Sequence, residues 1–250
     1  MHPDRRTASY PSSAAGQAGF HQTDTSCPIA AGTWQSAHWS AQSALSAADG
    51  VLGGERTVYA LCRPPGHHDF GDLAGGFCFF NNAAIAAQAL LRAGRRPAIL
   101  DVDVHHGNGT QGIFYRRRDV LTVSIHADPA RFYPFYWGHA AERGEDEGMG
   151  YNFNLPLPRG TVTEDYLVAL DLALDRIRSF GADVLVLALG LDAHKDDPLA
   201  GLSLETEDFR RIGARLSQLS VPMVLIQEGG YPTEALGANL SAFLEGFLKR

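Results

Sequence analysis

The chain has 250 residues, of which 45% are hydrophobic and 20% are charged, as expected for an ordered globular protein with one sizeable core. Its formal net charge of −7 disfavours nucleic acid as a partner, because phosphate binding needs a basic face. Cys27, Cys62 and Cys78 form no CxxC pair, which argues against a disulfide framework and a thiolate zinc site and favours a reducing compartment. No apolar run approaches the roughly 20 residues that span a bilayer, and the start lacks an apolar signal segment. We therefore expect a cytoplasmic protein without a membrane partner.

The predicted elements begin after an irregular arm. Residues 1–22 show no periodicity, and a single domain is expected over residues 23–250. In chain order, hydrophobic periodicity and turn residues predict a helix (29–52), a strand (57–62), a helix from an N-cap at Asn82 to Gly94, a strand (97–104), a short helix (109–115), two strands (120–126 and 151–157), a helix capped by Thr163 (164–180), a strand (183–192), a helix capped by Thr206 (207–219), a strand (222–231) and a C-terminal helix. The strands are continuous apolar runs, which are typical of a mainly parallel sheet covered by helices on both faces. The predicted fold class is therefore a three-layer α/β/α domain.

Polar clusters follow four of the predicted strands. They read RPPGHHDF, DVDVHHGN, GLDAHKDD and QEGGYP. Ligands of such sheets bind beyond the carboxyl ends of the strands. The clusters therefore predict one functional site at that edge.

The cluster DVDVHHGN has the character of a metal site. With a period of two, Asp101, Asp103 and His105 would lie on one side of the strand. Their carboxylates would repel each other unless a cation lay among them, and Asp192 is the natural third ligand beside Asp103 and His105. Carboxylates and an imidazole with an open position for water suit Zn²⁺. The alternative is that the acids cap helices and the histidines are merely exposed.

Two histidines and a tyrosine complete the candidate chemistry. His67 and His68 follow a stiff Pro-Pro-Gly turn, and adjacent residues of an extended chain point to opposite sides. Near a metal, one could act as a general base and the other as an acid or electrostatic partner; a second metal site or simple exposure is the alternative. Tyr231 could donate a hydrogen bond to an oxyanion, although a single loop tyrosine is more often a packed aromatic residue.

Two aromatic runs lie between these clusters. The run 77–80 contains Phe77, which could line an apolar slot, whereas core packing is expected for at least two of its three phenylalanines. The run 133–137 begins with Tyr133 and is irregular, which favours a partly exposed rim.

Together these motifs resemble the zinc-dependent histone deacetylase superfamily of the arginase/deacetylase fold. RPPGHH, GGFCFFNN, DVDVHHGNGTQ, LTVSIH, LGLDAHKDDPL and EGGY occur in the order of that family and cover residues 57–231. FYPFYWGHAAERG and PIAAGTWQSA are most similar to bacterial acetylpolyamine amidohydrolases and extend the resemblance back to about Thr23.

The resemblance implies a role for each matching residue. Asp103, His105 and Asp192 would bind zinc, and Asp101 would orient His67 as the general base. His68 would be the general acid or electrostatic catalyst with Asn108 behind it, and Tyr231 would polarise the carbonyl. A structural potassium ion would involve Asp101, Ser124 and the carbonyls of Asp103, His105 and Ile125. The substrate would contact Gly76, Phe77, Tyr133 and, near the rim, Leu199.

The implied activity is hydrolysis of an N-acetylated primary amine, either an acetylpolyamine or an acetyllysine-like group. Only 66 residues precede His67, so the fold is expected to be N-terminally shortened relative to the family. In acetylpolyamine hydrolases the preceding region supplies acids for the distal ammonium and contacts for a homodimer. Asp24 is the only obvious acid in the matching stretch of this chain.

Two other functions are compatible with parts of the sequence. DAHKD at residues 192–196 matches the DAHxD pattern of binuclear manganese ureohydrolases of the same fold, although that pattern precedes their second acidic motif and here DVDVHH comes first. Such an enzyme would also leave His67, His68 and Tyr231 without a role. The other alternative is a non-catalytic acyl-amine-binding protein with a disabled site.

Overall fold

The central feature of the fold is a parallel sheet. A computed structural model describes residues 9–199 and 201–249, and within them six strands pair in the order β1-β6-β5-β2-β3-β4, with every pair parallel. The strands are β1 (Thr57–Ala60), β2 (Pro97–Asp101), β3 (Leu121–Ala127), β4 (Asn152–Leu157), β5 (Val184–Leu189) and β6 (Met223–Gln227). This arrangement confirms the predicted parallel sheet.

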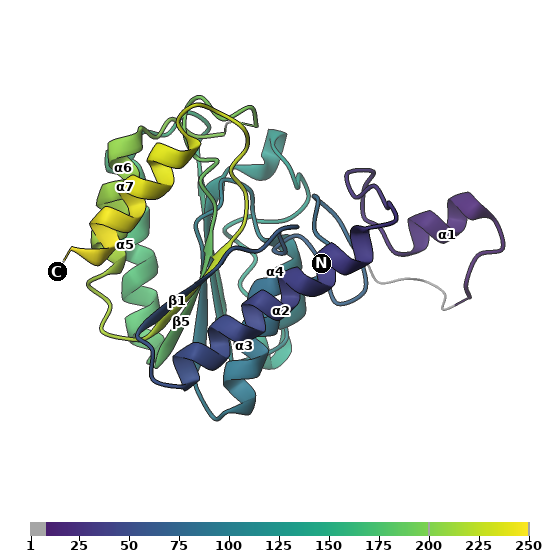
Figure 1. Cartoon of the computed structure of the whole chain (residues 1–250), viewed down its shortest axis with the longest axis horizontal. Helices are drawn as coiled ribbons and strands as arrows, with labels where there is room; N and C mark the ends of the chain where they lie inside the picture. Colours follow the sequence, from purple (N-terminus) through teal and green to yellow (C-terminus); the bar gives the residue numbers. More distant parts are fainter. Residues whose placement is uncertain (1–8, 200, 250) are drawn as a thin grey trace.

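Helices cover both faces of the sheet (Figure 1). One side carries α2 (Thr33–Leu52), α3 (Asn82–Arg92) and α4 (Asn108–Phe114), and the other carries α5 (Thr163–Phe180), α6 (Thr206–Leu216) and α7 (Leu236–Leu248). Successive strand residues point to opposite faces: Ile99 packs with the alanine-rich α2 and α3, whereas Leu100 packs against α5. Both faces are therefore buried, which explains the continuous apolar runs.

Some predicted boundaries were wrong by a few residues. β2 ends at Asp101, so Asp103 and His105 lie on the loop after the strand and not on one side of it. The caps also differ: Asn81 caps α3 through its side chain, Thr163 is the first residue of α5, and Glu205 forms a capping box with Asp208 at the start of α6. The predicted helix end at Gly181 is confirmed, since this residue has φ 73° in the left-handed region that glycine favours.

The arm contains a helix where irregular structure was expected. α1 (Ala14–Phe20) begins after Ser13, whose side chain accepts a hydrogen bond from Gly16 N, and it lies to one side of the molecule (Figure 1). After α1 the chain returns to the domain, because Thr23 N donates to the carbonyl of Ala74 at 2.8 Å. Residues 1–8 of the arm lie outside the described residues.

Two short 3-10 helices interrupt the loop between β3 and β4, at Pro129–Arg131 and Asp146–Gly148. Across residues 9–199 and 201–249, every helix is too short or too polar to cross a membrane.

Candidate active site

The four polar clusters meet because of the strand order. They follow β1, β2, β5 and β6, and these strands are neighbours in the sequence β1-β6-β5-β2 of the sheet. All strands are parallel, so their carboxyl ends lie at one edge. Residues from four distant parts of the chain thus converge on one site, as predicted.

Asp103, His105 and Asp192 form a compact group of possible metal ligands. Their ligand atoms all lie within 4.8 Å of one another, and all three residues are buried. His105 Nδ1 is 3.1 Å from Asp103 Oδ1 and 3.2 Å from Asp192 Oδ2. Two carboxylates and an imidazole are a donor set that suits a divalent metal with further positions open to water.

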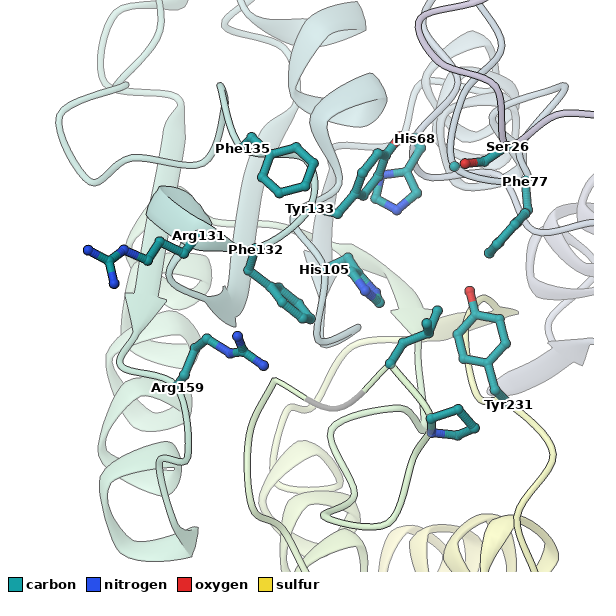
Figure 2. Close-up of a pocket in the computed structure, with 13 residues that line it drawn as sticks. Ser26, His68, Phe77, His105, Arg131, Phe132, Tyr133, Phe135, Arg159 and Tyr231 are labelled. Atoms are coloured by element: carbon teal, nitrogen blue, oxygen red, sulfur yellow. The ribbon is translucent and has the colours of Figure 1, made fainter.

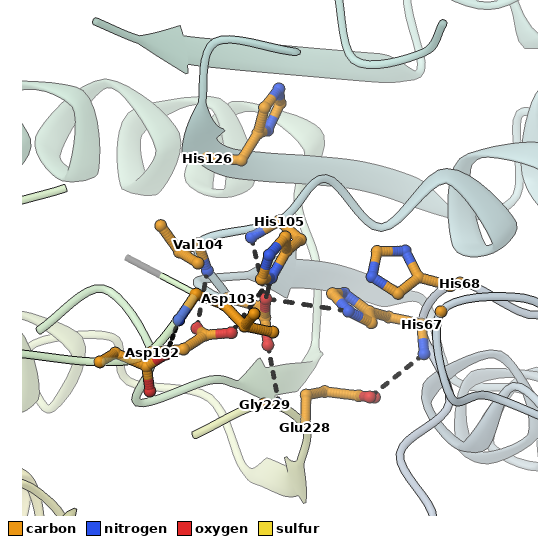
Figure 3. A network of polar contacts seen from close by, with 12 residues as sticks. His67, His68, Asp103, Val104, His105, His126, Asp192, Glu228 and Gly229 are labelled. Atoms are coloured by element: carbon orange, nitrogen blue, oxygen red, sulfur yellow. Dashed lines mark hydrogen bonds and ion pairs between the residues drawn. The ribbon is translucent and has the colours of Figure 1, made fainter. Parts of the chain in front are cut away.

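Backbone amides hold these carboxylates in place (Figure 3). Asp103 accepts from His105 N at 2.9 Å and from Gly229 N at 2.8 Å, and Asp192 accepts from Val104 N at 3.0 Å. Gly229 is required by the close approach, since a Cβ there would lie 2.3 Å from Asp192 Oδ2 and 2.5 Å from Asp103 Oδ2. The protein backbone therefore fixes the positions of these carboxylate oxygens.

The charges of this group fit a cation. Burial raises the pKa of Asp192 to about 7, and the neighbouring Asp103 carboxylate adds to this rise. Burial lowers the pKa of His105, but its hydrogen bonds to the two aspartates outweigh that effect and raise the pKa to about 9. A divalent cation among these groups would neutralise both buried carboxylates.

His67 and His68 lie side by side with different supporting partners. Their ring centroids are 3.9 Å apart. His67 Nδ1 is 2.9 Å from Asp101 Oδ2, and His68 Nδ1 is 2.7 Å from Asn108 Oδ1. The structure thus brings together each histidine and the orienting residue predicted for it.

The two imidazoles differ in their electrostatic surroundings. Burial lowers the pKa of His67, but the Asp101 and Asp103 carboxylates outweigh burial and hold the pKa well above its usual value. Burial also lowers the pKa of His68, and the neighbouring His67 and His105 lower it further. His67 is consequently the more basic of the pair.

Two acids that support the site were not assigned from the sequence. Glu228 Oε2 accepts from Gly66 N at 2.7 Å and from His67 N at 3.1 Å, and burial raises the pKa of Glu228 to about 7. Asp197 Oδ2 accepts from Tyr231 N at 3.0 Å. Glu228 lies in the polar cluster QEGGYP, and Asp197 lies in GLDAHKDD. Their place in these clusters after strands was the only sequence signal for a supporting role.

A cavity of about 410 Å³ leads to this group (Figure 2). All four residues predicted to contact substrate line it, and so do His68, His105 and Tyr231; the lining residues that the sequence did not indicate are Ser26, Arg131, Phe132, Arg159 and Pro198. His105 therefore belongs both to the lining of this cavity and to the candidate metal group.

Aromatic rings form the walls of the cavity. Phe77 is 41% exposed and has φ 69°, and its ring lies 5.9 Å from that of Tyr231. Phe132 stacks on His105 with an interplanar angle of 7°. Burial, followed by the nearby Asp103 and Asp192, raises the pKa of Tyr231, so its hydroxyl keeps its proton and can donate a hydrogen bond. Phe79 and Phe80 are half-buried and line a separate cavity beside α1.

The residues predicted to bind potassium are neighbours in the sheet. Asp101 and Ser124 are register partners in β2 and β3, and Ile125 follows Ser124. The Asp101 oxygens accept from Asp103 N and contact His67, while Ser124 Oγ contacts His126 Nδ1 at 2.8 Å. The potassium site remains a prediction.

The chain is similar to known proteins over nearly its whole length. The histone deacetylase domain family matches residues 4–247. The chain is 53% identical over 231 residues to an acetylpolyamine amidohydrolase of Burkholderia pseudomallei (92% of this chain, 68% of the relative) and 50% identical over 244 residues to acetylpolyamine amidohydrolase 1 of Pseudomonas aeruginosa (97% and 70%). A crystal structure of an acetylpolyamine aminohydrolase from Burkholderia pseudomallei superposes with a TM-score of 0.91 at 53% identity, covering 93% of this chain and 68% of the other.

Proposed function

This chain belongs to the histone deacetylase family, and on that premise we propose that it hydrolyses the amide bond of N-acetylated primary amines, with acetylpolyamines as the substrate class. Three relatives at 48–53% identity are named acetylpolyamine amidohydrolases. The observation that carries the proposal is the buried group Asp103, His105 and Asp192, of which His105 lines a cavity together with His68 and Tyr231. Acetyllysine is the second substrate that we consider.

We propose zinc as the metal that Asp103, His105 and Asp192 would hold. Their carboxylate and imidazole donors fit this ion, and no thiolate lies in the group. When bound, zinc supplies Lewis acidity toward the acetyl carbonyl and makes water more acidic. A structural potassium ion beside Asp101 and Ser124, a homodimer and a cytoplasmic location remain predictions.

The side chains of this protein carry the proton transfers. In its neutral form, His67 donates its Nδ1 hydrogen to Asp101 and takes a proton at Nε2 as a water oxygen adds to the carbonyl carbon. The resulting imidazolium delivers a proton to the amide nitrogen as the C–N bond breaks, giving acetic acid and the amine, which become acetate and an ammonium ion at neutral pH. His68, which donates its Nδ1 hydrogen to Asn108 Oδ1, acts beside it as general acid or electrostatic partner.

Tyr231 stabilises the charge that develops on the carbonyl oxygen. Tyr231 lines the cavity and its hydroxyl keeps its proton. The hydroxyl can therefore donate a hydrogen bond to the oxyanion. The aromatic walls at Phe77 and Tyr133 would flank the extended alkyl chain of the amine.

Turnover of N-acetylputrescine by the zinc-loaded protein tests the proposal, with an acetyllysine peptide in parallel. Tyr231→Phe and His67→Ala should each reduce kcat by at least about 100-fold, because they remove a transition-state donor and the general base. Tyr136→Phe is the matched control, since Tyr136 is 77% exposed and should retain full activity. Zinc-loaded protein that hydrolyses neither substrate would overturn the proposal.

The two alternatives make different predictions. Within residues 9–199 and 201–249, one group of three or more potential ligands lies close enough to hold a metal, whereas a binuclear manganese ureohydrolase needs two metal ions. Binding of two manganese ions together with release of urea from a guanidino substrate would favour that enzyme. Tight binding of acetylated amines without turnover would favour a non-catalytic binding protein.

A further inference from the structure

We infer that Asp24 is a positioning residue that fixes the separation of the two aromatic walls of the cavity, and thereby makes the enzyme selective for unbranched amines. This inference rests on the proposed function, because it concerns the substrate chain that the cavity would hold. Asp24 lies in the N-terminal segment; it does not line the cavity and does not belong to the candidate metal group.

The contacts of Asp24 join three segments of the chain. Its Oδ2 accepts from the hydroxyl of Tyr133 at 2.6 Å and from Gly76 N at 3.0 Å. Its Oδ1 accepts from Ser26 N at 2.7 Å. Tyr133 and the Gly76–Phe77 segment are the two walls of the cavity, so a single carboxylate is hydrogen-bonded to both walls.

Both walls lie against a proposed catalytic residue. The Tyr133 ring meets the His68 ring edge-on, with centroids 4.8 Å apart and an interplanar angle of 89°. A Cβ on Gly76 would lie 2.3 Å from His68 Cδ2 and 2.9 Å from the Tyr133 hydroxyl. A shift of either wall would therefore change the space beside His68.

The backbone of the wall needs an external constraint. Gly76 has φ 51° and the following Phe77 has φ 69°, a conformation that a non-glycine residue keeps only where its surroundings enforce it. The hydrogen bond from Gly76 N to Asp24 is one such constraint.

Asp24 is itself held by the backbone. Ala74 N donates to the carbonyl of His21, and Thr23 N donates to the carbonyl of Ala74, both at 2.8 Å. A Cβ on Gly75 would lie 2.1 Å from Thr23 Oγ1, so the two segments are in close contact. The carboxylate is therefore presented to Gly76 and Tyr133 from a fixed position.

The same contacts argue against a direct role for Asp24 in binding a substrate ammonium. The carboxylate already accepts three hydrogen bonds. Burial, and then the hydrogen bond to Asp24, raises the pKa of Tyr133, so the phenol stays protonated and remains a donor. Asp24 thus acts on substrate through the walls.

Two neutral amides test this inference: N-acetyl-1-aminobutane, which is linear, and N-acetylcyclohexylamine, which is bulky. The wild-type zinc enzyme should prefer the linear amide. Asp24→Ala should reduce the ratio of kcat/KM values (linear over cyclic) about tenfold, because misplaced walls no longer fit the linear chain. The change should appear mainly in KM for the linear amide, since the proposed proton-transfer residues are retained.

A double-mutant cycle separates this role from general destabilisation. Tyr133→Phe should also lower the ratio, but by less than Asp24→Ala does. Adding Tyr133→Phe to the Asp24→Ala variant should change the ratio by less than about twofold, because both substitutions remove the same hydrogen bond between Tyr133 and Asp24. Asp165→Ala, at an exposed position near the start of α5, should leave the ratio unchanged. If Asp24→Ala does not fold, Asp24→Asn should fold and lower the ratio to a smaller extent.

The outcomes distinguish the two proposals. A wild-type ratio in folded Asp24→Ala or Asp24→Asn protein would overturn the role of Asp24 and leave the deacetylase proposal intact. Wild-type protein that hydrolyses neither these amides nor N-acetylputrescine would overturn the proposed function. In that case the ratio of the two Kd values, measured by calorimetry, still tests the wall geometry with the same variants.

Discussion

Replacing Glu228 by Ala should destabilise the protein and impair the His67 segment together. Glu228 is fully buried, and its Oε2 accepts from the backbone amides of Gly66 and His67. Truncation leaves two buried donors without this acceptor, at about 1–3 kcal/mol each, or about 2–6 kcal/mol in total. Glu228→Gln keeps an acceptor oxygen for both backbone amides, so we expect a smaller loss of stability than in the alanine variant.

Urea unfolding followed by circular dichroism, in the presence of a chelator, measures both free energies of unfolding without a contribution from metal binding. With zinc restored, Glu228→Ala should also lower kcat more than about tenfold, because the backbone that places His67 is no longer fixed. Glu55→Ala, at an exposed position, controls for loss of a carboxylate. An alanine variant as stable as the glutamine variant would refute the reasoning.

Three further predictions follow from buried groups of the site and its surroundings. Burial raises the pKa of Asp69 to about 9 from an unfolded value of about 4, so the stability that it contributes is present at low pH and is lost as pH rises toward 9. Relative to wild type, Asp69→Asn should gain on the order of 5 kcal/mol of unfolding free energy between pH 4 and pH 8, and parallel pH profiles in urea unfolding would contradict this. Asp192→Ala should weaken zinc binding at least about 100-fold in a competition assay with a fluorescent chelator, because one of three ligands is lost; an unchanged Kd would contradict the ligand assignment. Gly229→Ala should also weaken zinc binding, since its Cβ would meet both ligand carboxylates, whereas Gly237→Ala, where a Cβ would have nothing within 4 Å, should bind zinc like wild type.

The sequence alone was sufficient to predict the strands, the helices α2 to α7 that cover them and the layers of the fold, but not α1. A strand buried on both faces must be apolar at every position, and runs such as residues 184–189 and 223–226 meet this condition. Glycine located two helix ends, because the left-handed conformation at Gly94 and Gly181 favours this residue. Cap positions were less certain, since several polar residues near each helix start can serve as the cap.

The candidate ligands and histidines were also visible in the sequence. Asp103, His105, His67 and Asp192 lie in polar clusters directly after apolar strands, and parallel strands place such clusters at one edge. No feature of the sequence marks the end of β2 at Asp101, so the position of Asp103 and His105 on a loop was not predicted. The end of a strand depends on where its neighbours in the sheet stop pairing.

Only the tertiary structure decided which residues support the site. Asp24 meets Tyr133 across 109 positions of the chain, and Glu228 meets His67 across 161. Local patterns determine periodicity, turns and caps because those depend on nearby residues. The partner of a buried carboxylate is set instead by the strand order and by how closely loops approach, and neither is encoded in the residues next to it.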